Sequence, residues 1–305
     1  MSNKVSVIIP AFNEEAGIEE VLQEIPQEIL LEHEVIVVDD GSTDNTFNVA
    51  RKYKVKVLRH EKNEGKVKAI FTGVNYATND LIVLMDADYS YSALDIPNLA
   101  KEVLNGADLV IGSRFMSKVQ NVPFLNRIGN RLFSLLISWV TGCELTDAQS
   151  GFRAFRKMLL KNMSFESKGL EFETEMTSKA CLQGLQIVEF PIEYRKRIGE
   201  SKLKPLADGF RMLKSIIRIT NEHSSTLSKS LIIPGLLFGL SGVFFGLYSI
   251  WDYVHTNLAG HGYFPLLTVL LITLSVQLIG TGILANQVGR QLHRLEQRLR
   301  QMSRD

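Results

Sequence analysis

The chain has 305 residues, with 34 Lys and Arg against 33 Asp and Glu, so its formal net charge is +1. This balance argues against a protein whose whole surface binds nucleic acid. The two cysteines, Cys143 and Cys181, are too few for a disulfide framework. The six histidines are scattered, and no Cys/His spacing in the sequence is typical of a zinc site.

Short apolar runs alternate with amphipathic segments over about the first 228 residues. Buried strands, rich in Val, Ile and Leu, are predicted at 5–10, 34–40, 55–60, 81–88 and 108–114. Helices are predicted between them at 14–25, 44–53, 66–76 and 94–104, and Asp44 is a candidate N-cap. This alternation predicts an α/β fold in which helices cover a mostly parallel sheet.

Charged side chains gather where the predicted strands end, which is where open parallel sheets bind ligands. Asp86 and Asp88 follow the fourth strand, and Arg114 follows the fifth. Two ionised carboxylates so close repel each other unless a cation lies between them, and oxygen ligands suit Mg²⁺ or Mn²⁺. The sequence therefore predicts a divalent-metal site. The alternative is a solvated turn in which Asp88 caps the next helix.

Three further polar segments allow two interpretations each. Asp40 either belongs to a turn or accepts hydrogen bonds from a base or ribose. The basic stretch 59–68 either contacts phosphate or begins a solvated helix. The segment 195–202 either binds substrate or anchors the chain on anionic lipid. A fourth segment, 147–153, combines an acid, a hydroxyl and a guanidinium.

The C-terminal part differs sharply from the rest, because Asp252 is its only charged residue between 231 and 285. Two apolar runs, 231–251 and 264–285, are each long enough to cross a hydrocarbon core of ~30 Å at ~1.5 Å per residue. Basic residues flank the two runs, and the link between the runs contains no Lys or Arg. This charge pattern places the first 228 residues, called the head below, and both termini in the cytoplasm. The N-terminus does not resemble a signal peptide.

The expected organisation is a cytoplasmic catalytic domain, juxtamembrane amphipathic helices, a transmembrane hairpin and a basic tail. These parts cover 1–204, 205–229, 230–286 and 287–305. Apolar residues at helical spacing in 205–223 predict an interfacial helix. The segment 124–140 is similar, and it either admits a lipid tail or is a buried domain helix. Two heptads in the tail favour a homo-oligomer.

Seven short motifs occur in order along residues 4–218. They are Pro10-Ala11-Phe12-Asn13-Glu14-Glu15, Val38-Asp39-Asp40-Gly41-Ser42-Thr43-Asp44, Asn63-x-Gly65-Lys66, Asp86-Ala87-Asp88, Gly112-Ser113-Arg114-Phe115, Ser150-Gly151-Phe152-Arg153 and Gly199-Glu200-Ser201-Lys202. With them the head resembles family 2 glycosyltransferases of GT-A fold. The last two motifs narrow the resemblance to the dolichyl- and polyprenyl-phosphate glycosyltransferases.

The resemblance implies a membrane-bound inverting transferase that moves glucose or mannose from a UDP- or GDP-sugar to undecaprenyl or dolichyl phosphate. It implies Mg²⁺ or Mn²⁺ held by Asp86 and Asp88. The implied nucleotide-binding residues are Pro10, Ala11, Asn13, Glu15, Asp40, Lys66, Asp86 and Ala87. The implied residues around the acceptor phosphate are Arg114, Ser150, Arg153, Arg197 and Lys202. The sequence departs from the family pattern at Val67, where a glycine is usual, and at Ser90, where a polar metal contact such as Gln is frequent.

The implied chemistry agrees with the residue types. A metal and a lysine stabilise the charge that develops on a leaving diphosphate. A lipid monophosphate, with a second pKa near ~6 by analogy with phosphoryl side chains, is largely ionised and needs positioning rather than a strong base. Arg114 and Arg153 would position it, because an arginine fork suits phosphate. Asp147 would orient an arginine or the metal, or act as a base.

Two other functions stay open at this point. A transferase acting on a sugar hydroxyl needs a carboxylate base, and the Gln-x-x-Arg-Trp string of processive members is absent from the sequence. A non-catalytic scaffold that binds nucleotide sugar or lipid has no need of metal and phosphate sites together. We expect a neutral hexose, because the motif segments offer no extra cation for an acidic sugar.

Overall fold

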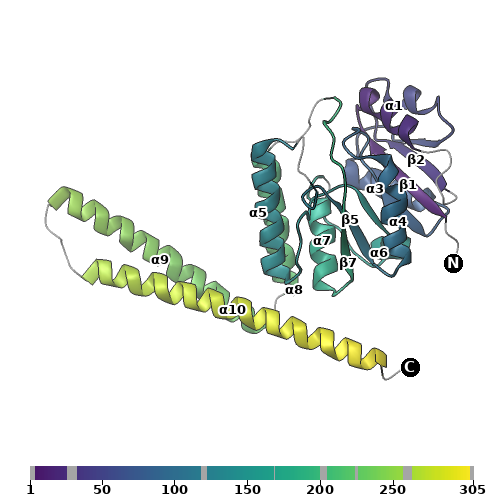
Figure 1. The fold of residues 1–305 in the computed structure, drawn as a ribbon. Coiled ribbons are helices and arrows are strands. Elements are labelled where there is room, and N and C mark those ends of the chain that lie inside the picture. Colours follow the sequence, from purple (N-terminus) through teal and green to yellow (C-terminus); the bar gives the residue numbers. More distant parts are fainter. Residues whose placement is uncertain are drawn as a thin grey trace. The chain divides into compact units, whose positions relative to one another are not determined.

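The computed structural model describes residues 4–25, 33–117, 122–167, 169–199, 205–223, 226–256 and 263–302. The chain forms two compact units, Met1–Ile219 and Thr220–Asp305 (Figure 1). The first unit is a sheet covered by helices, and the second is a pair of long helices.

The sheet of the first unit has seven strands in the order β3-β2-β1-β4-β6-β5-β7. β6 runs antiparallel to both of its neighbours, and all other pairs are parallel. The strands are β1 Val5–Ala11, β2 His33–Asp39, β3 Lys56–Arg59, β4 Leu81–Leu84, β5 Leu109–Ser113, β6 Arg153–Arg156 and β7 Ile187–Pro191. The predicted mostly parallel α/β fold is confirmed. β6 and β7 were not predicted, because arginines flank the two central residues of β6 and Glu189 interrupts β7.

Helices cover both faces of this sheet. The helices are α1 Glu15–Glu24, α2 Thr46–Ala50, α3 Lys66–Tyr76, α4 Ile96–Leu104, α5 Phe124–Thr141, α6 Lys157–Lys161, α7 Phe172–Leu182 and α8 Pro205–His223. α2 is shorter than predicted and begins at Thr46, so Asn45 and not Asp44 is its N-cap residue. The Asp44 carboxylate, one residue further back, still accepts the Thr46 amide at 3.0 Å.

The core has two layers because successive strand side chains point to opposite faces. Val7 and Ile9 of β1 pack with α1 and α4, whereas Ile8 of the same strand packs with α3 and α7. β4 is buried along its whole length. The polar residues that follow β1 and β4 are therefore attached to strands whose side chains are packed in the core.

The second unit is an antiparallel pair of helices, α9 Thr226–Thr256 and α10 Tyr263–Met302. A stripe of glycines on α9 lets the two backbones approach, as in membrane helix pairs. Cβ atoms built at Gly235, Gly239, Gly242 and Gly246 would meet Ile279, Ser275, Ile272 and Thr268 of α10 in turn. The descending order of the partners fixes the antiparallel register.

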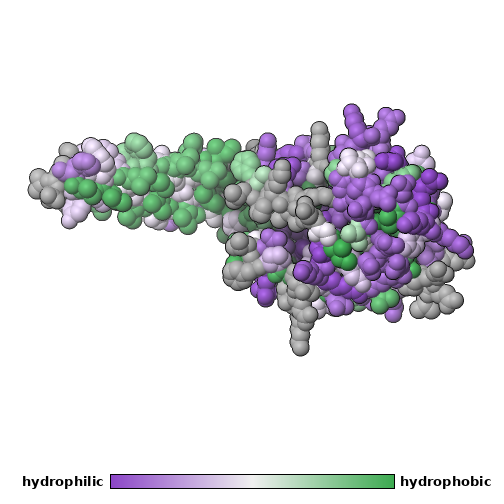
Figure 2. All heavy atoms as spheres, turned by 90° about the horizontal axis from the view of Figure 1, so that it is seen from above, coloured by the Kyte–Doolittle hydropathy of each residue, from purple (hydrophilic) through white to green (hydrophobic). Residues whose placement is uncertain are grey.

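The segments Ser230–His255 and Tyr263–Asn286 are long and apolar enough to cross a membrane, with mean hydropathies of 2.0 and 2.1. Both predicted runs fall within them. Figure 2 shows apolar side chains over the surface of this unit, and they include Leu240, Phe244, Leu266 and Val269. By length and composition, then, the chain carries two candidate membrane spans.

The register of the α9–α10 pair leads to a cross-linking prediction. A Cβ at Gly239 would lie 3.5 Å from the Ser275 Cβ, which is within the range that a disulfide requires. We expect the variant with Gly239→Cys and Ser275→Cys to form an internal disulfide under mild oxidation, detected by mass spectrometry as loss of free thiols. Pairing Gly239→Cys with Thr273→Cys, on an exposed position of α10, should leave both thiols free. Equal cross-linking of the two pairs would contradict this register.

Candidate functional site

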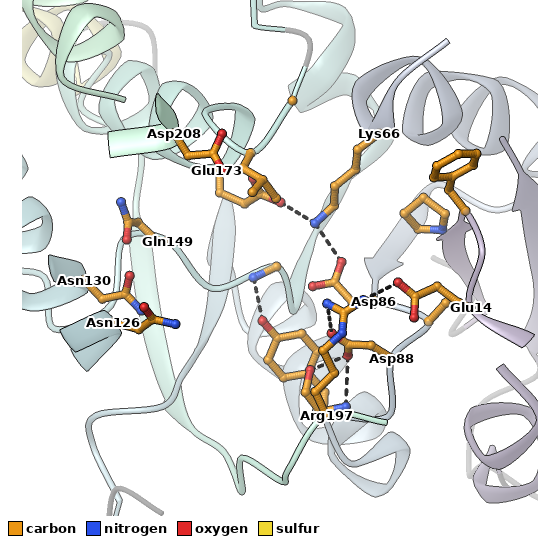
Figure 3. A pocket seen from close by; sticks show the side chains of 18 of the residues that line it. Glu14, Lys66, Asp86, Asp88, Asn126, Asn130, Gln149, Glu173, Arg197 and Asp208 are labelled. Carbon is orange, nitrogen blue, oxygen red and sulfur yellow. Dashed lines mark hydrogen bonds and ion pairs between the residues drawn. The ribbon is translucent and has the colours of Figure 1, made fainter. Parts of the chain in front are cut away.

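A cleft of about 500 Å³ lies at the carboxyl ends of β1 and β4. Pro10 and Ala11 of β1 and the segment Asp86–Asp88 after β4 form one wall. α5 and α8 contribute the opposite wall, with Asn126, Asn130 and Asp208 (Figure 3). This is the edge at which parallel sheets bind ligands.

The carboxylates of Asp86 and Asp88 both contact cations that line the cleft. Asp86 Oδ1 lies 2.7 Å from Lys66 Nζ, and Asp88 Oδ2 accepts a hydrogen bond from Arg197 at 3.0 Å (Figure 3). Asp88 does not cap the next helical turn, since Ser92 accepts the Leu94 amide there. The capping alternative for Asp88 is therefore wrong.

The turn that follows Asp88 is conformationally constrained. Tyr89 has φ +66°, a left-handed conformation that non-glycine residues rarely adopt and that tends to occur at functional sites. The Ser90 amide donates to Asp88 Oδ1 at 3.0 Å. On the other side, Gly17 lets α1 pack closely on this loop, because a Cβ there would lie 2.6 Å from the Ala87 carbonyl oxygen. The Asp88 carboxylate and the backbone of this loop are thus held in place by local contacts.

Lys66 begins α3 and bridges two carboxylates. Its Nζ lies 2.7 Å from Asp86 and also 2.7 Å from Glu173 Oε1, at the start of α7. Burial by itself would lower the pKa of Lys66, but Asp86 and Glu173 outweigh burial and raise this pKa above its usual value. Lys66 therefore stays cationic at physiological pH.

Glu173 was missed by the sequence reasoning. Residues all around α7 are buried, from Phe172 to Cys181, and its charged residues follow no helical stripe that separates a core face from a solvent face. The sequence does contain one signal of such a residue. Three charged residues, Glu173, Glu175 and Lys179, lie in a helix that has no polar face. Such charges need partners when they are buried.

Arg197 bridges Asp88 and Glu14, the latter through a short ion pair. Its segment is held along the loop after β4, because the Ile198 amide donates to the Asp88 carbonyl at 3.0 Å and Tyr194 forms a bridge with Tyr91. Arg197 therefore lines the cleft, as predicted for substrate contact. Lys202 lies outside the described residues.

Arg114 also lines the cleft and is held by Asp147 in a bidentate pair, with N···O distances of 2.7 and 2.8 Å. Burial alone would lower the pKa of Arg114, and Asp147 raises it well above its usual value. Asp147 is fully buried and also accepts the Arg114 amide at 3.0 Å. Its geometry is that of a residue that orients an arginine.

Ser150 and Arg153 are both fully buried and lie outside the residues that line the described part of the cleft. The Arg153 guanidinium donates to the carbonyls of Ala148 and Ser150 at 2.7 Å each, and to Thr177 Oγ1 at 2.8 Å. These bonds fix the segment that places Gln149 and Gly151 on the cleft.

The predicted nucleotide-binding residues divide into two groups. Pro10, Ala11, Asp40, Lys66, Asp86 and Ala87 line the cleft, together with Phe12 and Glu14. Asn13 and Glu15 instead join two loops, since Asn13 Oδ1 accepts the Thr43 amide and Glu15 Oε2 accepts the Asn45 amide.

Asp40 supports the turn before α3. It accepts the amides of Glu64 and Gly65 at 2.9 and 2.8 Å and contacts His60 Nδ1 at 2.7 Å. Gly41 is required beside it, because its φ is +71° and a Cβ there would lie 2.5 Å from the Lys62 carbonyl carbon. The Asp40 carboxylate therefore shapes the cleft while its oxygens are largely occupied.

The donor set of Asp86 and Asp88 fits a Mg²⁺ or Mn²⁺ ion that shares its coordination with a ligand. Both residues offer carboxylate oxygens, the donors that these ions prefer. Among the described residues, no cluster of three or more His, Cys, Asp or Glu side chains is placed to hold a metal. Oxygens of a bound diphosphate and waters would complete the shell, as is usual for Mg²⁺.

Gly151 is a sensitive position in this site. A Cβ there would lie 2.5 Å from Asp86 Oδ2, so Gly151→Ala must displace the carboxylate. We expect the rate of the reaction that this cleft supports to fall about a hundredfold, the scale of a misplacement of about 1 Å in an active site. Gly129→Ala, also on the cleft but with nothing within 4 Å of the new Cβ, should retain activity in the same rate assay. Comparable losses in both variants would contradict this interpretation.

Comparison with known proteins leads to the same family that the sequence motifs resemble. The model of the family described as "Glycosyl transferase family 2" matches residues 6–164. A dolichol-phosphate mannosyltransferase from Pyrococcus furiosus is 33% identical, over 84% of this chain and 74% of its own length. A dolichyl-phosphate hexose transferase from Haloferax volcanii is 34% identical, over 72% of this chain and 95% of its own length.

A solved structure shares the fold. Glucosyl-3-phosphoglycerate synthase from Mycobacterium tuberculosis, crystallised with Mn²⁺, UDP and phosphoglyceric acid, matches with a TM-score of 0.59 and 23% identity over 72% of this chain and 78% of that one. This confirms the predicted GT-A fold. The family match covers more than half of the chain and agrees with both relatives. The chain belongs to glycosyl transferase family 2.

Proposed function

We propose that this glycosyltransferase moves a neutral hexose from a nucleotide sugar to a polyprenyl phosphate at a membrane surface, with inversion at the anomeric carbon. The observation that carries the proposal is one cleft that is lined both by the Asp86 and Asp88 carboxylates and by Arg114, an arginine fixed by Asp147. Relatives named for dolichyl-phosphate transfer and the two candidate spans support it.

On the donor side, Asp86 and Asp88 would hold Mg²⁺ or Mn²⁺. When bound, the ion supplies positive charge for the leaving diphosphate. Lys66 and Arg197 lie beside these carboxylates and add two cations at the same place. Fixed cations of this kind stabilise developing charge without having to reorganise.

On the acceptor side, Arg114 would position the lipid phosphate. Asp147 occupies the Nε and one terminal nitrogen of the guanidinium. Within the described part of the chain no hydrogen bond reaches the other terminal nitrogen, which would serve the ligand. Because the phosphate is itself an oxyanion at neutral pH, the attack needs no strong base. We assign Asp147 to orientation, since its carboxylate is buried behind Arg114.

Ser150 and Arg153 would act indirectly. Arg153 donates hydrogen bonds to the carbonyls of Ala148 and Ser150. The residues that follow these two, Gln149 and Gly151, line the cleft. Lys202 and a closing role for its segment remain predictions.

The membrane side of the proposal rests on two apolar stripes of the first unit. The stripe on α5 consists of Ile128, Leu132, Leu135 and Trp139, and the stripe on α8 of Phe210, Leu213 and Ile217, all exposed. Opposite faces of these helices pack together through residues such as Phe133 and Ile216. Exposed apolar stripes interleaved with Arg and Lys suit an interfacial position, and α8 is soon followed in sequence by the first candidate span.

The pattern of basic flanks supports a cytoplasmic location for the head and both termini. A homo-oligomer built through the heptads of the tail remains a prediction. α10 is helical through Met302, as this prediction requires.

The sugar is proposed to be neutral because the cations that line the described part of the cleft already have phosphate roles in this proposal. Lys66 and Arg197 would serve the leaving diphosphate, and Arg114 the acceptor phosphate. An acidic sugar would need a further cation to offset the cost of burying its charge.

A transfer assay tests the proposed function. Full-length protein in detergent is incubated with Mn²⁺ and either radiolabelled UDP-glucose or GDP-mannose, with undecaprenyl or dolichyl phosphate as acceptor. We expect label from one donor to enter the organic phase and EDTA to abolish this transfer. Nucleotide binding without any lipid labelling would favour a hydroxyl acceptor or another sugar, and absent binding would contradict the proposal.

A further inference from the structure

Each of the two motif carboxylates shares its cation with a second carboxylate from elsewhere in the fold. Lys66 lies 2.7 Å from both Asp86 and Glu173 (Figure 3). Arg197 contacts both Asp88 and Glu14. Glu173 and Glu14 come from α7 and the loop after β1, and both line the cleft.

This arrangement bears on how a divalent ion could bind. An ion at Asp86 meets Lys66, which already occupies Oδ1, and the two cations repel each other. A partly buried ammonium that lost its only carboxylate would be left unpaired, which is costly. Lys66 would then compete strongly with the ion for the Asp86 carboxylate. Glu173, whose side chain is only 6% exposed, gives Lys66 a second partner beside the first.

We propose that Glu173 is a positioning residue that retains Lys66 when Asp86 passes to a divalent cation, and so sets the affinity of the cleft for that cation. The inference rests on the proposed function, in which the cation serves the leaving diphosphate. Glu14 stands in the same relation to Arg197 and Asp88.

The contacts of the two glutamates of α7 distinguish the proposed role of Glu173 from a role in packing alone. Glu175, the other glutamate of this helix, makes several contacts within the surrounding fold: it pairs with Lys179 at 2.6 Å, accepts the Ser167 amide at 2.9 Å and meets Arg218 of α8 at 3.3 Å. Glu173 also acts at a distance on the core, because burial lowers the pKa of Arg153 and the charge of Glu173 opposes this shift. The Glu173 carboxylate is instead directed into the cleft, toward Lys66 (Figure 3).

Direct binding of Mn²⁺ to the full-length protein in detergent, measured by electron paramagnetic resonance without nucleotide, tests the proposal. We expect Glu173→Gln to weaken Mn²⁺ binding about tenfold, because Lys66 then has only Asp86 as a partner. Lys66→Met should strengthen binding, since the competing cation is gone. Adding Glu173→Gln to Lys66→Met should have no further effect. Glu171→Gln, which removes the same charge from the residue before α7, should bind Mn²⁺ like wild type.

Two results would overturn the inference. Unchanged Mn²⁺ affinity in Glu173→Gln would show that Lys66 needs no second partner, and this comparison suffices if the Lys66→Met chains do not fold. An equal loss in the Lys66→Met background would make Glu173 a direct ligand of the ion. Failure of the proposed function appears separately, as a wild-type protein that binds neither UDP nor GDP with Mn²⁺.

Discussion

Asp88→Ala is expected to lower sugar transfer about 10²- to 10³-fold, the scale on which a preorganised electrostatic contact acts in a transition state. The Asp88 carboxylate faces the cleft, holds Arg197 at 3.0 Å and is itself held by the Ser90 amide. Its loss would remove one of the two proposed oxygen donors for the metal and release Arg197 at the same time. The measurement is the initial rate of lipid labelling at saturating donor and Mn²⁺.

A matched control for this variant is Asp80→Ala. Asp80 precedes β4 at the end opposite Asp88 and pairs with Arg156 on the surface, with the Asp80 side chain 58% exposed. We expect its rate to remain that of wild type. An Asp88→Ala protein that turns over like wild type would refute the assigned metal site and revive a non-catalytic role for the cleft.

The second large effect concerns stability rather than chemistry. Arg153→Ala is expected to cost about 3–5 kcal/mol of folding free energy, because it leaves buried partners of a charged group unsatisfied and opens a cavity. Arg153 is fully buried and serves two carbonyls and Thr177. For a domain of this size the melting temperature should fall by about 10 °C, measured by thermal denaturation of the full chain in detergent.

Arg156→Ala provides the comparison on the same strand. Its side chain is 37% exposed, and it pairs with the exposed Asp80, a class of interaction worth about 0–1 kcal/mol. Its melting temperature should stay close to that of wild type. If Arg153→Ala melts like wild type and only its KM for the acceptor rises, Arg153 contacts the acceptor phosphate directly and the indirect role is wrong.

The frame of the molecule could be predicted from the sequence because apolar periodicity reports burial. The buried runs gave β1, β2, β4 and β5 to within a few residues, and β4 is apolar throughout. β6 escaped prediction because its first residue is a fully buried arginine, which no apolar pattern reveals. The two candidate membrane spans were evident from length and lack of charge alone.

The edge of the sheet that carries the site was also determined by the sequence. Parallel strands end at a common edge, so Asp40, Asp86 and Arg114 had to lie near one another once the strands were known, and all three line the cleft. The same argument could not choose between adjacent residues of a loop. Phe12 and Glu14 face the cleft, whereas Asn13, with φ +49°, and Glu15 tie neighbouring loops together.

The pairing of charges was decided only by the tertiary structure. Lys66 meets Glu173, and Glu14 meets Arg197, across long stretches of sequence, because helices from different parts of the chain pack around one strand edge. Similarly, Arg153 points into the core while Arg114, after the neighbouring strand, reaches the cleft. Hydrophobic periodicity predicts which side chains are buried. It does not predict the partner of a buried charge, because this partner belongs to whichever element the fold brings within about 3 Å. The sequence by itself therefore determined the fold, the two candidate spans and the sheet edge that carries the cleft, and the three-dimensional packing determined which charges meet there.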